Sequence, residues 1–275
     1  MKELINIVGP CSAMSSEQVL ACAEQAKKRN IQIFRASGWK PRSEHGWDGL
    51  KEESLPILAE VAAMGLTPAT EVLTLDDAKL VIETIDKVSN HQGLVLWGGS
   101  RNQSHPFKEG LARLTSEVPW LTAGFKNQMW KAEKHFRGIA THIVEGAGAG
   151  SDRLFMCHRG FHNENFEKGQ YRNIPDHAMA MRVRAEATKL NLEVPIEMLI
   201  DPSHIGGCPE NVLEVIKQAM THSYAGIMVE VQDNPAASAT DADQHLDWNQ
   251  WDQDIVPLLA RWNALRNSRA DLQAA

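Results

Sequence analysis

The sequence predicts an α/β fold, a single (β/α)8 TIM barrel, on three observations. Eight short apolar runs alternate with segments whose apolar residues recur at helical spacing, which predicts βα units and a parallel sheet. Eight such units within 275 residues favour a closed barrel over an open sheet. The first run ends at Gly9-Pro10-Cys11, which lacks the glycine pattern of the phosphate loop in a doubly wound fold.

Each strand is expected where an apolar run stops at glycine, proline or a polar residue. In chain order these runs are residues 4–8, 31–34, 66–72, 94–97, 121–125, 154–157, 196–200 and 227–229. Helices are expected after a serine cap at residues 15–16, over residues 55–64, 78–88, 130–144 and 178–190, and in the last segment around residues 255–262. We therefore expect a barrel over residues 1–265 and a polar C-terminal tail over residues 266–275.

Composition and charge exclude several classes of function. A net charge of −7 argues against a nucleic-acid or anionic-membrane partner. No apolar run is long enough to span a bilayer, and residues 1–28 lack the pattern of a signal peptide. The cysteines form no close pair and no CxxC motif, so we expect a cytoplasmic protein whose functional cysteines act as thiolates.

Polar and ionisable residues follow every predicted strand. The carboxyl ends of the strands of a parallel barrel meet on one face, so these side chains are expected to converge there. Several cations on one rim would repel each other, which favours an anionic ligand carrying phosphate and carboxylate groups. The residues at these strand ends are Cys11, Arg35, Glu71, Arg101, Lys126, Arg159, His204 and Glu230.

A basic loop after the second strand contains Lys40-Pro41-Arg42. The proline fixes its own φ and moves Lys40 toward an extended conformation, which predicts a stiff loop that presents Lys40 and Arg42. An isolated basic triplet is more often a solvated surface loop, and its position at the mouth of the barrel favours the binding role.

Cys11, His204 and Glu230, with an aspartate from the loop that follows Glu230, form a second constellation. Mixed sulfur, nitrogen and oxygen ligands suit a divalent transition metal such as Mn, Fe, Co or Zn better than Mg or Ca. A single cysteine or histidine at a strand end is usually structural, so this prediction depends on all of them ending strands of one barrel.

Several short motifs, in one order along residues 5–246, resemble the 3-deoxy-D-arabino-heptulosonate 7-phosphate (DAHP) synthase family. The likeness is to its short type I, beta-like branch, without the N-terminal regulatory domain that many relatives carry. The motifs are VGPCS (8–12), Arg35 with KPRS (40–43), GSR (99–101), KN (126–127), RG (159–160), DPSHIGG (201–207) and MVEV (228–231).

The resemblance implies a condensation of phosphoenolpyruvate with erythrose 4-phosphate, the first step of the shikimate pathway. It implies a divalent metal held by Cys11, His204, Glu230 and Asp241, where Asp241 is preferred to Asp243 for its distance from Glu230. It further implies a cytoplasmic homo-dimer or homo-tetramer, with a fused or separate chorismate mutase as a partner.

The same resemblance assigns the substrate contacts. Arg101, Lys126 and Arg159 would hold phosphoenolpyruvate, with Arg35 and Lys40 beside them. Arg42 and Ser43 would take the phosphate of the aldose, although many relatives have threonine at the position of Ser43. Lys40 would protonate the developing alkoxide and Glu71 would position a water molecule.

His158 is a further departure from the family pattern, and two rival functions fit parts of the sequence. His158 stands where the branch often has glutamate, and it is expected to be a neutral spacer or an orienting residue; His245 is expected on the surface. A 3-deoxy-D-manno-octulosonate 8-phosphate synthase would carry Ala-Asn between its lysine and arginine, whereas this chain has only Pro41. A non-catalytic regulatory barrel should have lost at least one of the polar residues named above, and none is missing.

Overall fold

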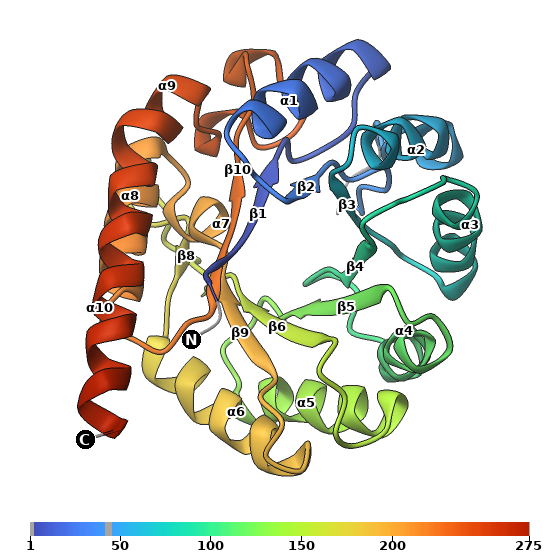
Figure 1. Cartoon of the computed structure of the whole chain (residues 1–275). Coiled ribbons are helices and arrows are strands. Elements are labelled where there is room, and N and C mark those ends of the chain that lie inside the picture. Colours follow the sequence, from blue (N-terminus) through green and yellow to red (C-terminus); the bar gives the residue numbers. More distant parts are fainter. Residues whose placement is uncertain (1–2, 42–45, 275) are drawn as a thin grey trace.

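Eight parallel strands close into a barrel (Figure 1). The computed structural model describes residues 3–41 and 46–274. β1 pairs with β2 on one side and with β10 on the other, which closes the sheet and confirms the predicted (β/α)8 barrel. Around the barrel the strands are β1 (Ile5–Gly9), β2 (Ile33–Arg35), β3 (Thr67–Glu71), β4 (Leu94–Gly98), β5 (Leu121–Lys126), β6 (Leu154–His158), β9 (Glu197–Ile200) and β10 (Gly226–Glu230).

An outer layer of helices surrounds the strands (Figure 1). Polar caps start several of them: Ser15 accepts a hydrogen bond from the first turn of α1, and Thr74 forms a capping box with Asp77 at α3. The helices are α1 (Ser16–Lys28), α2 (Leu55–Ala63), α3 (Leu75–Asp86), α4 (His105–Glu117), α5 (Glu133–Ala147), α6 (His177–Leu190), α7 (Pro202–Gly206), α8 (Pro209–Ala219), α9 (Trp248–Gln250) and α10 (Val256–Ala274).

The sequence did not predict α4, α7 or α8, nor the small hairpin of β7 (Phe161–His162) and β8 (Asn173–Ile174). The hairpin lies in the connection between β6 and α6. Helix α10 runs through residue 265 without a break. The division of the chain there into a barrel and a C-terminal tail remains a prediction. None of the described helices combines the length and apolar character that a membrane span needs.

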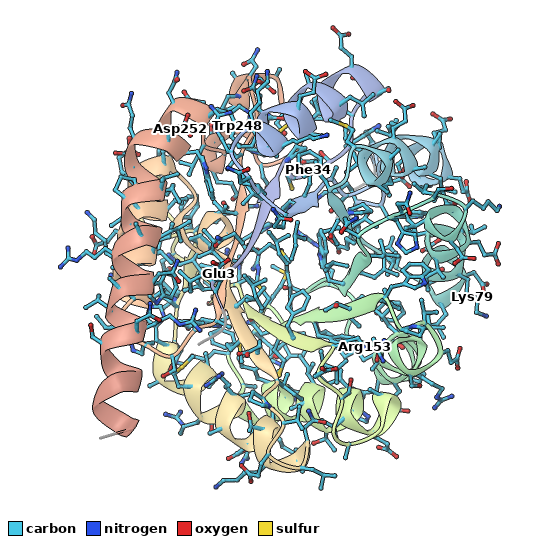
Figure 2. The ribbon with its side chains drawn as sticks, in the orientation of Figure 1. Glu3, Phe34, Lys79, Arg153, Trp248 and Asp252 are labelled. Atoms are coloured by element: carbon cyan, nitrogen blue, oxygen red, sulfur yellow. The ribbon has the colours of Figure 1, made fainter. Side chains whose placement is uncertain are left out.

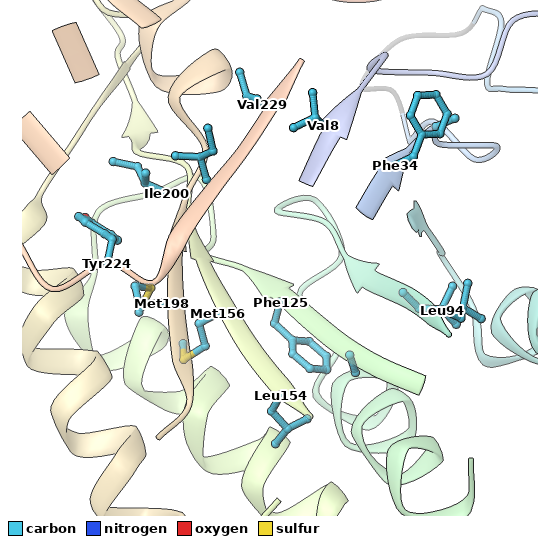
Figure 3. Close-up of a cluster of buried hydrophobic side chains, with 14 of the residues drawn as sticks. Val8, Phe34, Leu94, Phe125, Leu154, Met156, Met198, Ile200, Tyr224 and Val229 are labelled. Atoms are coloured by element: carbon cyan, nitrogen blue, oxygen red, sulfur yellow. The ribbon is translucent and has the colours of Figure 1, made fainter. Parts of the chain in front are cut away.

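The strands separate two apolar layers because their side chains alternate between the two faces. Val8, Phe34, Phe125, Met156 and Val229 point outward to the helices, as Figure 3 shows. The inward positions fill the barrel itself with a second cluster, made of Ile7, Ala69, Val95, Trp97, Phe155, Cys157, Leu199, Ala225 and Met228. The barrel interior is therefore a packed core below the face that carries the strand ends.

The last segment of the chain covers the barrel beside α1. Arg29 at the end of α1 forms an ion pair with Asp252 at 2.7 Å, and its guanidinium lies 4.9 Å from the ring centre of Trp248. Figure 2 labels both partners at the edge of the molecule where the two segments meet. Trp248, Trp251 and Trp262 are buried, which confirms that they pack the last helical segment.

Gly124 in β5 leaves space that the ring of Phe155 from β6 occupies in the barrel interior. A Cβ at this position would overlap the ring, so Gly124→Ala is expected to lower the free energy of unfolding by about 1–3 kcal/mol. Gly138→Ala in α5 is the matched control, because nothing lies within 4 Å of the added Cβ. That change should raise the stability by about 0.5–1 kcal/mol, since alanine favours a helix.

Urea unfolding of both variants, followed by circular dichroism, measures the two shifts in midpoint. A Gly124→Ala protein as stable as the Gly138→Ala protein would show that the barrel interior is not packed as described.

Candidate active site

The carboxyl ends of the strands form one polar cavity of about 420 Å³. Arg35, Glu71, Lys126 and Glu230 are the last residues of their strands. Side chains two residues apart share a face, so Glu71 and Glu230 continue the inward rows of Ala69 and Met228. The cavity is lined by Lys40, Pro41, Glu71, Gly99, Ser100, Arg101, Lys126, Arg159, Arg172, His204, Ala239, Thr240 and Asp241.

Cys11 lies buried beneath this cavity. The Nζ of Lys40 is 3.0 Å from its Sγ and 3.3 Å from its carbonyl oxygen, and Asp241 Oδ2 is 3.5 Å from its Sγ. Burial and the charge of Glu230 raise the pKa of the Cys11 thiol to about 12. The thiolate form therefore needs an additional positive charge close to the sulfur.

Glu230 is completely buried, and its carboxylate is held from several sides. Gln244 Nε2 donates to Oε2 at 2.6 Å, and Arg35 Nη2 lies 3.2 Å from Oε1. Burial opposes ionisation, but His204 and Arg35 outweigh it and lower the pKa of Glu230 to about 2. Oε1 has no hydrogen bond of good geometry within the described part of the chain, although it faces Arg35.

His204 stands on the short helix α7, whose first turn is capped by Asp201. Its Nδ1 lies 2.9 Å from Asp201 Oδ2 and 3.6 Å from Glu230 Oε1. Its Nε2 lies 3.7 Å from Asp241 Oδ2. The imidazole ring of His204 thus lies between the carboxylate of Glu230 and that of Asp241.

These side chains fit a divalent transition metal. The ligand atoms of Cys11, Glu230 and Asp241 lie within 4.8 Å of one another, and His204 reaches both carboxylates from the side. Ligands on opposite sides of such an ion are about 4.2 Å apart, so small side-chain adjustments suffice. The donors are sulfur, nitrogen and oxygen, a set that suits Mn, Fe, Co or Zn.

The cations on the other side of the cavity are fixed by buried partners. Lys126 forms an ion pair with Asp201 at 2.6 Å. Arg159 donates through Nη1 to Asn173 Oδ1 and through its backbone N–H to Asn127 Oδ1. Burial lowers the pKa of Arg159 to about 10, which keeps the guanidinium charged at neutral pH. Arg101 lies on the exposed rim of the same cavity.

The structure brings together every predicted site residue that it describes; Arg42 and Ser43 lie outside the described residues. His158 is buried and accepts a hydrogen bond from the backbone N–H of Asp176 at 3.0 Å. Burial lowers the pKa of His158 to about 3, so its ring is neutral and orients the start of α6.

Several residues of the site were missed in the sequence, among them Arg172, Gln244 and His245. Arg172 binds Asp241 at 2.7 Å, and Gln244 binds Glu230. The prediction of an exposed His245 was wrong, because only 1% of this residue is exposed. Its Nε2 accepts from the backbone N–H of Cys11 at 3.0 Å, and its Nδ1 lies 2.9 Å from the carbonyl oxygen of Asp241. The one available signal was that Gln244 and His245 closely follow Asp241 in sequence.

Comparison with known proteins agrees with this geometry. The model of the DAHP synthetase I family matches residues 2–259. The chain belongs to this family. This match confirms the resemblance to DAHP synthases that the sequence motifs indicated.

One curated protein and two solved structures from Thermotoga maritima are similar to this chain. The curated protein named phospho-2-dehydro-3-deoxyheptonate aldolase is 30% identical over 244 residues, which are 88% of this chain. The chain spans 65% of the length of that relative. A crystal structure with the same protein name has a TM-score of 0.75 at 24% identity, covering 97% of this chain and 70% of the other. A truncated DAHP synthase has a TM-score of 0.72 at 22% identity, covering 97% and 87%, and both likenesses support the fold.

The buried pair of Lys126 and Asp201 generates a stability prediction. Asp201→Asn keeps an oxygen that can cap α7 but removes the charge opposite Lys126, so we expect a loss of about 3–5 kcal/mol in the free energy of unfolding. Glu186→Gln is the control, because its ion pair with Arg137 at 3.4 Å is exposed on both sides. It should change the stability by less than about 0.5 kcal/mol.

Chemical denaturation of both variants at neutral pH measures this difference. Equal shifts in the two midpoints would contradict the description of Lys126 and Asp201 as a desolvated pair.

Proposed function

We propose that this chain catalyses the condensation of phosphoenolpyruvate with erythrose 4-phosphate to give DAHP and phosphate, the first step of the shikimate pathway. The observation that carries the proposal is one cavity that joins anion-binding cations to a thiol–carboxylate–imidazole set. Family membership and the name of the curated relative support it.

Phosphoenolpyruvate fits the half of the cavity that carries the buried cations. Its phosphate and carboxylate require several donors, and guanidinium groups match both planar and tetrahedral oxyanions. We assign these contacts to Arg159, Lys126 and Arg101, which line the cavity, with the buried Arg35 beside Glu230 as a further positive charge. Since Asn127 and Asn173 hold Arg159, its orientation is set before the substrate binds.

The aldose phosphate is assigned to the loop after β2. The backbone N–H of Lys40 donates a hydrogen bond to the carbonyl oxygen of Asp48, and its side chain contacts Cys11, so the position of Lys40 is fixed. We assign the distal phosphate of the aldose to Arg42 and Ser43, which follow in the sequence. In this assignment the aldehyde end of the substrate lies beside Lys40, Cys11 and Asp241.

Cys11, His204, Glu230 and Asp241 would hold the divalent metal, with Mn, Fe, Co and Zn as the candidates. Such an ion, when bound, acts as a Lewis acid on the aldehyde oxygen. Arg172 and Gln244 orient Asp241 and Glu230 through hydrogen bonds, and His245 fixes the backbone of Cys11.

The proton transfers are assigned to Lys40 and Glu71. Burial opposes the charge of Lys40, but Cys11, Glu71 and Asp241 raise its pKa above the ordinary value, so it enters the reaction protonated. As C3 of phosphoenolpyruvate attacks the aldehyde carbon, Lys40 donates its proton to the forming alkoxide. The attack leaves a cationic C2, and Glu71 accepts a proton from the water that adds there. The C2–O bond to the phosphate then breaks, and the new C2 hydroxyl passes its proton to the departing phosphate, which leaves the ketone of DAHP.

The remaining expectations concern the environment of the enzyme. A cytoplasmic location, a homo-dimer or homo-tetramer, and a fused or separate chorismate mutase stay predictions from the resemblance to the family. Sedimentation of the purified chain measures the oligomeric state directly.

Removal of the metal is expected to abolish turnover. Dialysis against EDTA should stop phosphate release, and Mn²⁺ or a similar ion should restore it, because the sulfur and carboxylate donors then hold the Lewis acid again. Full activity in excess EDTA with no metal in the protein would reject this part of the proposal.

Cys11→Ala tests the same metal site by removing one of its proposed ligands. The change removes a metal ligand and little core volume, so the variant should fold and show no measurable turnover. Near-ultraviolet circular dichroism serves as the folding control, and Cys22→Ala, which alters a buried cysteine within α1, should remain active.

The aldose preference tests the substrate assignment. With Lys40-Pro41-Arg42 setting the reach to the distal phosphate, kcat/KM for erythrose 4-phosphate should exceed that for arabinose 5-phosphate by at least about 100-fold, or about 2.7 kcal/mol. A phosphate-release assay with each aldose measures both constants. Comparable values would reject the four-carbon substrate and leave the reaction class in place.

A further inference from the structure

We propose that α4 and α5 carry a second divalent-metal site on the outside of the barrel, formed by Glu109, His142 and Glu145 with His105 at its edge, and that the ion it fits is Zn²⁺. None of these residues lines the catalytic cavity. The two helices are neighbours in the outer layer (Figure 1).

Helical spacing puts the four side chains on two facing stripes. His105 and Glu109 are four residues apart on α4, and His142 and Glu145 are three residues apart on α5. Residues at these separations project from one face of a helix. Each helix therefore offers one imidazole and one carboxylate.

Close packing of the backbones holds the two stripes together. A Cβ on Gly146 would overlap the carbonyl oxygen of Glu109, so the helices approach each other at the level of this site. Glycine inside a helix is unfavourable by about 1 kcal/mol relative to alanine, and here it permits that approach. The donors from α5 are thus adjacent to Glu109 on two rigid elements.

The donor atoms are close enough for one ion. Those of Glu109, His142 and Glu145 lie within 4.8 Å of one another. The ligands of a tetrahedral Zn²⁺, each about 2.1 Å from the ion, are about 3.4 Å apart, so small side-chain adjustments bring these atoms to one ion. His142 Nδ1 already points at Glu109 Oε1 at 2.5 Å. The ring of His105 stacks on that of His142 with 3.9 Å between centres, so it lies at the edge of this set and supports the orientation of the His142 ring.

The local charge favours a dication. Among the ion pairs of the described residues, Glu109 has His142 as its partner, and Glu145 takes part in none. Two carboxylates without a neutralising lysine or arginine attract a divalent cation, and imidazole ligands select Zn²⁺ over Mg²⁺ or Ca²⁺. An ion that joins α4 to α5 stabilises the folded chain through its binding free energy.

Metal content of the full-length chain tests the site. After dialysis against micromolar Zn²⁺, the protein is expected to retain two equivalents, one at the active site and one between α4 and α5. His142→Ala and the near-isosteric Glu145→Gln should each lose one equivalent. His91→Ala, a partly exposed histidine after α3, is the matched control and should keep both.

Co²⁺ distinguishes which ion is lost. The active site contains a thiolate and should give a sulfur-to-metal charge-transfer band, whereas the site between α4 and α5 has only nitrogen and oxygen donors. His142→Ala should keep the charge-transfer band and turnover while losing one equivalent of Co²⁺. Retention by the unmodified protein of only the equivalent that gives the thiolate band, unchanged metal content in both variants, or loss of the thiolate band in His142→Ala would overturn the proposal.

Discussion

Mutual compensation of buried charges is the interaction on which the candidate active site depends. Arg35 and Glu230 face each other at 3.2 Å, and Lys126 and Asp201 at 2.6 Å, in a region almost fully removed from water. A single ion at this depth would be strongly destabilising, whereas paired ions are tolerated when further hydrogen bonds hold them. The pairs keep cations and carboxylates charged beside one another, which is the condition for binding an anionic substrate and a metal in one cavity.

Strand register controls which side chains enter that network. Alternation puts the last residues of β2, β3, β5 and β10 inside the barrel, and a slip by one residue would turn them into the apolar layer beneath the helices. The loop after β10 then adds the outer wall of the site. Its end returns to the sheet, where Leu246 donates its backbone N–H to the carbonyl oxygen of Glu230, and this return brings His245 against Cys11.

The sequence predicted the barrel and the deep residues of the site because both follow from local pattern. Apolar runs of strand length that end in charged residues locate Arg35, Lys126 and Glu230 directly. Arg172 and His245 could not be located in the same way, since their contacts depend on how long loops fold back over the mouth. Helix α4 was missed because the apolar stripe of its face is interrupted by polar residues, including Lys108, whose buried ammonium bonds to the carbonyl oxygen of Asn102.

We propose that one cavity holds a metal beside an anion-binding wall. A crystal structure of the chain with Mn²⁺ and phosphoenolpyruvate, with anomalous scattering to locate the ion, tests it most directly. We expect an ion bound by Cys11, His204, Glu230 and Asp241, and a phosphate in contact with Arg159 and Lys126. An ion bound without Cys11 and Glu230, or a phosphate away from both cations, would contradict it.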